Sequence, residues 1–470
     1  MSSLTGTVVG KVIKVPHIVH GKAVFGDAVE HRSRVGDLFL TPKLDLDALV
    51  RPRSEPGPAF EVPLREILDL LGETGRRLNL DTNPHLAEAL DLISASSRHS
   101  RRVVENTYRV IGQTFEPGAL GYQVERELGP GVIDGWVPVY KPNAPSCQVR
   151  AFPPRLVHIM AGNGPPAASI SIIRGALTKG INLLKLPSND LFTATAILRT
   201  MADIAPDHPT VRSFSAAYWR GGDEAVERLI YRPQYFDKLV AWGGEATIRH
   251  ALKYVGPGFE LVQFDPKVSM SMIGREAFCD AETLERVAGL AAEDVNMMNQ
   301  EGCASSRHQF VEGDVKEVDR YCAALARQLA VDRFWGDGKI WKTPADIRDT
   351  VEGLRFTGTH AVFGHYDGRG LVVRSNEPVD FHPIAKTVNV IPVASLRDAV
   401  RYASVATQTV GIYPRERKAE VRDALANAGV QRVVTLGSAI GLATTGQGLP
   451  HDGFLPLQRL MRWVSDEESE

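Results

Sequence analysis

A strict alternation of short apolar runs and helical runs between Leu156 and Phe264 limits the possible folds more than any other feature of the chain. Five apolar runs predict strands: LVHIMA, INLLKL, VRSFSAAYW, KLVAWG and FELVQF. Four runs between them have the three- and four-residue apolar spacing of helices: AASISIIRGALTKG, LFTATAILRTMADI, DEAVERLIYR and EATIRHALKYV. Since a β-α-β crossover is right-handed and lays its helix over the sheet, this order predicts a doubly wound α/β domain with a parallel sheet.

The residues that directly follow these strands are small or polar, in the loops GNGPP, PSND, RGGD, GGEA and DPK. Ligands of such sheets bind beyond the carboxyl ends of the strands, where glycine lets the backbone approach a phosphate and the N–H groups of a helix start bind it. Any one of these loops could equally be ordinary turn chemistry, and the dinucleotide fingerprint G-x-G-x-x-G is absent. The repetition of the pattern predicts a nucleotide site at this edge.

The rest of the chain divides into segments of different pattern. Residues 1–60 are rich in β-branched residues, glycine and proline, which predicts short strands and loops, and helical spacing follows from Val62 to about Phe115. The stretch GPGVIDGWVPVYKPNAPSCQVRAF predicts an extended hairpin or arm, and a second α/β lobe begins after Ser269. The expected organisation is an N-terminal strand and loop segment (1–60), a cofactor-binding domain (61–125 and 152–268), a catalytic domain (269–445), and an arm and tail suited to oligomerisation (126–151 and 446–470).

The composition favours small-molecule chemistry. A formal net charge of −2 over 470 residues gives no basic field for nucleic acid. The sequence has no recognisable signal peptide and no uncharged apolar stretch long enough to span a membrane, so we expect a cytoplasmic protein. Four scattered cysteines without a C-x-x-C pair argue against a disulfide framework or a zinc site, and we expect no metal.

One of these cysteines, Cys303, lies in NQEGCASSRHQFVEG, between the long helical pattern AETLERVAGLAAEDVNMMNQ and a strand candidate. A thiolate is a strong nucleophile, but no histidine is adjacent, and His308 lies within the strand candidate. Position alone therefore leaves both a nucleophile and a structural thiol open. Cys322 falls on the apolar stripe of the helix VKEVDRYCAALARQLA and is expected in a core, while Cys147 and Cys279 have no chemical context.

The segment around Cys303 resembles the nucleophile segment of the aldehyde dehydrogenase superfamily, through Asn299, Gly302, Ser306 and Arg307. Within that superfamily, VPHIVHGKAV, NQEGCASS and LPHDGFLPLQRLMRW are similar to segments of the fatty acyl-CoA reductases of bacterial bioluminescence, the LuxC-like type. The resemblance spans most of the chain. It implies an aldehyde-dehydrogenase-like fold, with a doubly wound Rossmann-type cofactor domain, an α/β catalytic domain and an extended oligomerisation arm.

The resemblance also implies roles for individual residues. Cys303 would be the nucleophile, and Asn163 in MAGNGPP would bind the oxyanion. Lys185 in LLKLPSND would bind the adenosine ribose. The further cofactor contacts expected in the loops after the strands are Ser188, Gly222, Trp242, Gly243 and Gly244.

Two departures from the superfamily pattern bear on the chemistry. Hydrolytic members carry a Glu in an E-L-G-G-K segment that activates water; if Lys267 matches that lysine, Gln263 stands in place of the Glu, and an amide is no base. In the other register Glu260 would be the base. Ser188, three residues after Lys185, stands where NAD-preferring members often have a Glu, and its hydroxyl tolerates a 2′-phosphate. NADPH is therefore the expected cofactor.

The expected activity is NADPH-dependent reduction of an acyl thioester to an aldehyde through a thioacyl intermediate on Cys303. The acyl group, fatty or aromatic, would come from CoA or from an acyl-activating or acyl-transferring protein partner, and a homo-oligomer is expected. Two alternatives stay open. One is a hydrolytic NAD(P)-dependent aldehyde dehydrogenase with Glu260 as base. The other is an inactive acyl carrier or scaffold, suggested by Val379 in VDFHP, where the superfamily motif E-x-F-G-P begins with Glu.

Overall fold

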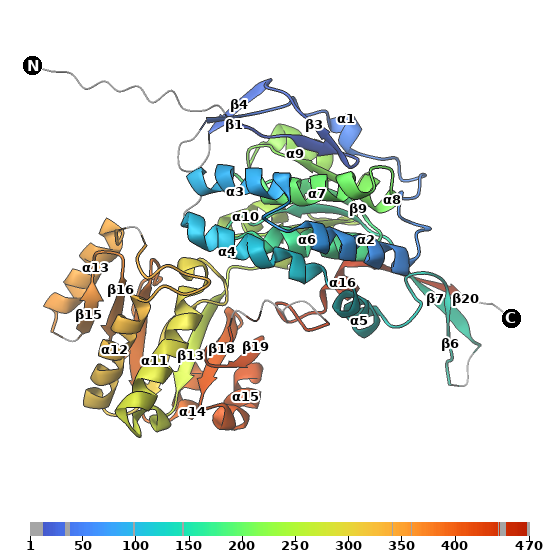
Figure 1. Cartoon of the computed structure of the whole chain (residues 1–470). Coiled ribbons are helices and arrows are strands. Elements are labelled where there is room, and N and C mark those ends of the chain that lie inside the picture. Colours follow the sequence, from blue (N-terminus) through green and yellow to red (C-terminus); the bar gives the residue numbers. More distant parts are fainter. Residues whose placement is uncertain are drawn as a thin grey trace, which may run out of the picture.

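The computed structural model of the chain describes residues 13–32, 38–96, 99–142, 145–340, 342–358, 360–439, 441 and 448–467. These residues form two lobes, each built around a seven-stranded sheet, and a narrow arm that extends from the first lobe (Figure 1). The predicted boundary between catalytic domain and tail, at residues 445 and 446, lies outside the described residues. Across the described part of the chain, every helix is too short or too polar to cross a membrane.

The first sheet contains the five predicted strands, all parallel, in the order β12-β11-β8-β9-β10, and two N-terminal strands extend it beyond β10. The predicted runs are β8 (Arg155–Ile159), β9 (Ile181–Lys185), β10 (Phe214–Ala217), β11 (Lys238–Trp242) and β12 (Glu260–Phe264). The connecting helices are α6 (Pro166–Leu177), α7 (Thr193–Ile204), α8 (Pro209–Arg212), α9 (Glu224–Ile230) and α10 (Glu245–Ala251), the last continued by η2 (Leu252–Tyr254). This confirms the doubly wound arrangement. Because β9 and β11 flank β8 on opposite sides, the ligand crevice of such a sheet falls beside the carboxyl end of β8.

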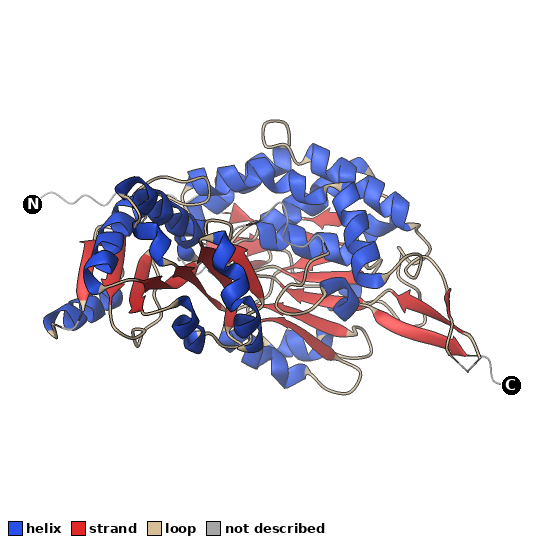
Figure 2. Cartoon of the chain, turned by 90° about the horizontal axis from the view of Figure 1, so that it is seen from below, coloured by secondary structure: helices blue, strands red, loops and turns tan. Residues whose placement is uncertain are grey.

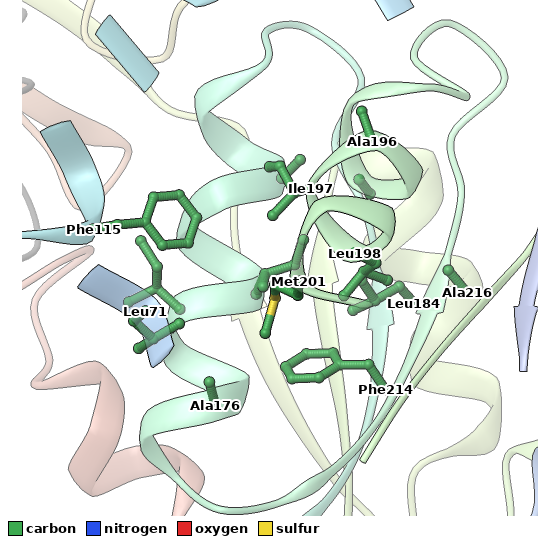
Figure 3. Close-up of a cluster of buried hydrophobic side chains, with 14 of the residues drawn as sticks. Leu71, Phe115, Ala176, Leu184, Ala196, Ile197, Leu198, Met201, Phe214 and Ala216 are labelled. Atoms are coloured by element: carbon green, nitrogen blue, oxygen red, sulfur yellow. The ribbon is translucent and has the colours of Figure 1, made fainter. Parts of the chain in front are cut away.

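Helices cover both faces of this sheet (Figure 2). One face packs against α6, α7 and the predicted helical segment, which comprises α2 (Leu64–Arg77), α3 (Pro84–Ser96), α4 (Arg101–Ile111), η1 (Gly112–Phe115) and α5 (Pro117–Leu128). Figure 3 shows part of this core, where Leu71 and Phe115 gather with Ile197, Met201 and Phe214. The other face packs against α9 and α10. The sheet is thus buried on both sides, which explains why its strands are continuous apolar runs.

The N-terminal segment is built from short strands and loops, as predicted. β1 (Ile13–Lys14), β4 (Val29–Arg32) and β5 (Leu38–Thr41) form a small sheet, and α1 (Leu46–Leu49) follows. β2 (His17–Val19) and β3 (Lys22–Val24) instead extend the first sheet, because β2 pairs antiparallel with β10.

The second lobe has a seven-stranded sheet in the order β15-β16-β17-β14-β13-β18-β19, in which only β15 runs antiparallel to its neighbour. Its strands are β13 (Val268–Ile273), β14 (Ser306–Glu312), β15 (Ala361–His365), β16 (Gly370–Arg374), β17 (Thr387–Val393), β18 (Thr407–Tyr413) and β19 (Arg432–Thr435). Its helices include α11 (Ala281–Asn296) and α12 (Val315–Leu329) on one face, α14 (Leu396–Ala399) and α15 (Lys418–Asn427) on the other, and α13 (Ala345–Phe356) beside β15. Cys322, in α12, is fully buried in the core that α12 forms with α11, which confirms its predicted core role.

The prediction of one helix running into Cys303 is wrong in its last turn. α11 ends at Asn296, and in the following short helix η4 (Met297–Gln300) the residues Met298, Asn299 and Gln300 have φ of 48°, 54° and 70°. The apolar spacing of MMNQ is helical, but tertiary contacts of these residues reverse the hand of the backbone.

The arm is a three-stranded sheet in the order β20-β7-β6, and it projects away from both lobes (Figure 1). β6 (Val137–Val139) and β7 (Cys147–Phe152) form the predicted hairpin, and β20 (Arg462–Glu467) pairs antiparallel with β7. The helix α16 (Pro456–Leu460) leads into β20 and packs on α5. The end of the described chain is thereby tied to a segment more than three hundred residues earlier.

The connection between β12 and β13 sets how the two sheets face each other. β12 ends at Phe264, and β13 begins at Val268 after three residues. The carboxyl edge of the first sheet therefore meets the amino edge of the second. Cys303, which precedes β14, lies at that amino edge and so faces the predicted nucleotide crevice.

Candidate active site

Cys303 is half-buried in the short connection between η4 and β14. Its backbone carbonyl accepts a hydrogen bond from Ser269 Oγ at 2.8 Å, and Ser269 is the second residue of β13. The nucleophile candidate is therefore fixed to the central strands of the second sheet.

Buried hydrogen bonds hold the left-handed backbone that precedes Cys303. Asn299 Nδ2 donates to Asp337 Oδ2 at 2.9 Å, and Asn299 Oδ1 accepts from the Asp337 backbone N–H at 2.8 Å. The buried Arg307 guanidinium donates to the carbonyls of Gln300 and Pro383. Three successive non-glycine residues with positive φ are costly, and such a conformation persists only where its surroundings over-determine it. The resemblance singled out Asn299 and Arg307, and the structure gives both this holding role.

Asn163 reaches the same loop from the first lobe. It follows β8, and its Nδ2 donates to the backbone carbonyl of Glu301 at 3.0 Å. The backbone carbonyl of Asn163 accepts from His99 Nε2 at 2.9 Å. Two of the predicted catalytic residues, Asn163 and Cys303, are thus brought together across the junction of the lobes.

Two residues that the sequence did not identify affect the ionisation of the Cys303 thiol. Gln408, in β18, donates through Nε2 to Asp452 Oδ1 at 2.8 Å. Burial raises the pKa of the Cys303 thiol, and the Asp452 carboxylate raises it further, while the Gln408 amide lowers it. The only sequence signal was the HDG of the terminal segment, which also fits an ordinary turn.

His451, beside Asp452, is half-buried and neutral. Its Nδ1 accepts from Arg174 Nη2 at 3.0 Å, and burial together with Arg174 and Arg432 lowers the pKa of His451 to about 3. Burial lowers the pKa of Arg174 to about 10, so this guanidinium keeps its charge at neutral pH. The stacked rings of Trp242 and Phe264, with centroids 3.9 Å apart, lie next to this pair.

The predicted cofactor residues all lie at the carboxyl edge of the first sheet. Lys185 ends β9, with its Nζ 5.4 Å from the centroid of the Trp219 ring, and Trp242 ends β11. Gly222 has φ of +86°. Added Cβ atoms at Gly222 and Gly244 would meet nothing within 4 Å, so the backbone there borders open space. Ser188 is half-buried in the loop after β9, and Gly243 packs closely on Thr247. Open glycine backbone beside a strand-end lysine fits a dinucleotide phosphate chain.

The two candidates for a general base, Glu260 and Gln263, lie toward opposite ends of β12. Glu260 begins β12, at the end of the strand opposite the crevice, and pairs with Lys238 at 3.1 Å. Gln263 donates to Asp265 Oδ2 at 3.3 Å. Gln263 also lines a cavity of about 710 Å³ beside β12, together with Lys267 and Asp452. No group of three or more His, Cys, Asp or Glu side chains arranged to hold a metal ion occurs among the described residues.

Solved structures share this architecture. Aldehyde dehydrogenase 21 from Physcomitrella patens superposes with a TM-score of 0.73 at 12% identity, over 97% of this chain and 98% of that chain. The NAD-dependent benzaldehyde dehydrogenase from Corynebacterium glutamicum superposes with a TM-score of 0.70 at 13% identity, over 98% and 99%. These likenesses confirm the predicted aldehyde-dehydrogenase-like fold.

Sequence relatives narrow the assignment. The long-chain acyl-protein thioester reductase of Aliivibrio fischeri is 32% identical over 347 residues, which cover 72% of this chain and 68% of that protein. The long-chain acyl-protein thioester reductase 2 of Photobacterium leiognathi is 28% identical over 422 residues, or 87% and 83%. The model of the family described as acyl-CoA reductase (LuxC) matches residues 59–463. The chain therefore belongs to the acyl-CoA reductase (LuxC) family, and the predicted enzyme class, an aldehyde-forming reductase of acyl thioesters, is confirmed.

Proposed function

We propose that the protein reduces an acyl thioester to an aldehyde through a thioacyl intermediate on Cys303, with NADPH as reductant. The observation that carries this proposal is the hydrogen bond between Asn163 and the Glu301 carbonyl. It joins the loop at the crevice of the cofactor sheet to the loop that bears the thiol, two residues before Cys303. A nucleophile beside a dinucleotide crevice is the arrangement that such a reduction needs.

The residues around Cys303 can stabilise the oxyanion that forms when its sulfur attacks the acyl carbon. The Asn163 amide has two N–H hydrogens, of which the Glu301 carbonyl accepts one. The second N–H of Asn163 and the backbone N–H of Cys303 are the donors that we assign to the oxyanion. One such donor is typically worth about 3 kcal/mol of transition-state stabilisation.

The same site is poorly equipped to hydrolyse the thioacyl intermediate. Glu260 lies at the far end of β12 and is paired with Lys238, and Gln263 is an amide, which cannot activate water. The acyl group therefore stays on sulfur until it is reduced. This placement of Glu260 counts against the alternative of a hydrolytic aldehyde dehydrogenase that uses it as base.

The cofactor assignment rests on the carboxyl edge of the first sheet. Lys185, Gly222, Trp242, Gly243 and Gly244 would hold the dinucleotide, and the Ser188 hydroxyl would tolerate a 2′-phosphate. When bound, the reduced nicotinamide supplies the hydride that turns the thioester into an aldehyde. Release of the aldehyde leaves the Cys303 thiolate free for another cycle.

The relatives suggest the substrate class. Their names describe reductases of long-chain acyl-protein thioesters. We propose a long-chain acyl group delivered as a protein thioester, with the chemically equivalent acyl-CoA as a simpler donor. An acyl-transferring protein is then the expected partner, and the arm is the expected contact of a homo-oligomer.

The test is a spectrophotometric assay of the purified protein with fatty and aromatic acyl-CoAs and with NADPH or NADH. We expect acyl-dependent loss of nicotinamide absorbance, faster with long chains and with NADPH. Cys303→Ala should abolish it, while Cys279→Ala, at an exposed thiol just before the start of α11, serves as the matched control and should not. Reduction by folded Cys303→Ala at the parent rate would refute the proposal.

A further inference from the structure

We propose that His99 is a positioning residue of the acyl-transfer site: it holds the backbone carbonyl of Asn163 and thereby directs the Asn163 amide at the developing oxyanion. This inference rests on the proposed function, which assigns the oxyanion to Asn163 and to the backbone N–H of Cys303. His99 precedes α4, in a part of the chain where neither the apolar pattern nor the resemblance predicted a site residue.

A buried imidazole contacts the Asn163 loop from the inside of the molecule. His99 Nε2 lies 2.9 Å from the backbone carbonyl oxygen of Asn163, and only 6% of His99 is exposed. Because a carbonyl oxygen can only accept, Nε2 carries a hydrogen and donates it to this oxygen. The Asn163 side chain is exposed, so the supporting residue lies behind the loop and the supported amide lies in front of it.

The loop needs this support because glycine lies on both sides of Asn163. Gly162 and Gly164 have no Cβ, which leaves many backbone conformations open to the chain. A Cβ added at Gly164 would lie 3.1 Å from Met298 Cε, so a stiffer residue would crowd the short helix η4. The bond from His99 fixes the peptide group that follows Asn163. It therefore sets the direction in which the Asn163 side chain leaves the loop.

Hydrogen bonds at two points then fix the Asn163 amide. His99 holds the backbone carbonyl, and the side-chain Nδ2 donates to the Glu301 carbonyl at 3.0 Å. Since the amide is planar, the direction of this first N–H also determines where the second N–H points. Without the His99 bond the loop could rotate, and the second N–H would move away from the oxyanion. A displacement of about 1 Å is enough to cost a large part of a catalytic contribution.

The next residue in the chain supports the opposite side of the site. Ser100 caps the start of α4, and its Oγ donates to Asp337 Oδ1 at 2.8 Å. Asp337 in turn accepts from Asn299, in the left-handed backbone that precedes Cys303. Two adjacent residues therefore hold the two halves of the site: His99 holds the loop of the oxyanion donor, and Ser100 holds the loop of the nucleophile.

His99 acts through Asn163 and not on the substrate, because the carbonyl bond occupies Nε2. In acyl transfer the Cys303 thiolate forms a bond to the acyl carbon, and the carbonyl electron pair moves onto the oxygen. The carbonyl then re-forms, and the donor leaves as a thiolate, so charge and atoms balance. Only the stage with charge on oxygen depends on Asn163, and only that stage should depend on His99.

Two variants of nearly equal shape test the proposal. His99→Gln keeps a donor nitrogen as many bonds from Cα as Nε2 is, whereas His99→Met has no donor. Acylation of Cys303 by long-chain acyl-CoA is followed by mass spectrometry without nicotinamide cofactor. We expect His99→Met to react about 30-fold more slowly than the parent, part of the roughly 100-fold that loss of one oxyanion donor costs, and His99→Gln within about threefold of the parent. Equal rates in the two variants would overturn the proposal.

Alkylation by iodoacetamide separates this role from an effect on the thiol, because the sulfur displaces iodide without forming an oxyanion. The alkylation rate of Cys303 in His99→Met should stay within about twofold of the parent rate. If acylation and alkylation slowed together, His99 would act on the thiol or on the fold, and the proposal would be wrong. Should His99→Met fail to fold, His99→Asn replaces it in both assays, since its amide is one carbon shorter and stops short of the carbonyl.

A double-mutant cycle shows whether the effect passes through Asn163. In an Asn163→Ala background, His99→Met should slow acylation by less than about twofold, because the amide that His99 positions is gone. A residue with a general structural role would slow acylation as much in this background as in the parent. An undiminished effect would therefore contradict the assignment.

Failure of the proposed function has a different signature. If the parent is not acylated on Cys303, or if Asn163→Ala is acylated at the parent rate, the function or its oxyanion donor is wrong, and the role of His99 falls with it. If the parent is acylated, Asn163→Ala is slow and His99→Met is as fast as the parent, only the role of His99 is wrong.

Discussion

Single residues show where sequence reasoning about the site succeeds and where it ends. Cys303 and Asn163 were singled out by the resemblance of their segments to the aldehyde dehydrogenase superfamily, since position alone left the role of the thiol open. Gln408 could not be found, because it is one of three successive polar residues in the buried strand β18 and nothing in the sequence distinguishes it from its neighbouring threonines. Asp452 lies far along the chain from Cys303, and only the folded chain brings the two together.

Gln408 gives a prediction at this scale. The Gln408 amide lowers the pKa of the Cys303 thiol, so in Gln408→Leu that pKa should rise. An interaction worth about 1 kcal/mol corresponds to roughly a fivefold slower reaction with iodoacetamide at a fixed pH below the thiol pKa. Peptide mass spectrometry after timed labelling measures it, with the exposed Cys279 in the same digest as the internal control. Equal labelling of Cys303 in parent and variant would contradict the prediction.

Secondary-structure elements were predicted well where burial sets the pattern. The five parallel strands of the first sheet are recognisable in the sequence as apolar runs, because both faces of the sheet are covered. The helices between them are recognisable by the spacing of their apolar residues, because one face of each helix is apolar. The left-handed turn after α11 was missed, because the bonds between Asn299 and Asp337 that hold it come from a distant segment. Local preference decides an element only where no such contact competes with it.

The C-terminal part of α11 carries a pH-dependent contribution to stability. Asp294 accepts from the backbone N–H groups of Gly437 and Ala439, and burial raises its pKa to about 7. An unfolded aspartate releases its proton near pH 4, so between these values the folded chain holds more protons than the unfolded chain. The free energy of unfolding should therefore fall as pH rises, by at most about 1.4 kcal/mol per pH unit from this group.

Asp294→Asn should remove that slope. Urea unfolding of parent and variant at half-unit steps from pH 4.5 to pH 7.5 measures the difference in free energy between them. The parent should lose stability relative to the variant as pH rises. A constant difference across this range would mean that Asp294 titrates at its ordinary pKa in the folded chain.

At the scale of the whole molecule, the sequence predicted two α/β lobes and an arm but not how they are joined. The start of α4, in the first lobe, is tied to the loop of residues 333–337 in the second. Arg102 donates to the carbonyls of Arg333 and Gly336 and to the Asp337 carboxylate, which Ser100 Oγ also contacts. Asp337 in turn holds Asn299, so the attachment of the lobes reaches the backbone before Cys303. Hydrogen bonds of this kind, between polar side chains and distant segments, produce no periodic pattern in a sequence.

Arg102→Met tests this attachment. Loss of its bonds to two carbonyls and a carboxylate should lower the free energy of unfolding by about 2 kcal/mol and speed hydrogen exchange in residues 297–303 and 333–337. Arg101→Met is the matched control, because Arg101 pairs with the exposed Asp91 and a surface pair contributes little. Equal hydrogen exchange of these residues in the two variants would show that Arg102 does not stabilise the backbone that precedes Cys303.

The pairing of β20 with β7 has a consequence for the folding of the chain during its synthesis on the ribosome. Translation produces Cys303 well before the turn that carries Asp452, and that turn is anchored through α16 and β20 to a strand made much earlier. A nascent chain stalled ahead of residue 448 would lack α16 and β20, so one edge of β7 would stay unpaired. The three-stranded arm should thus be completed only after residues 456–467 have been made.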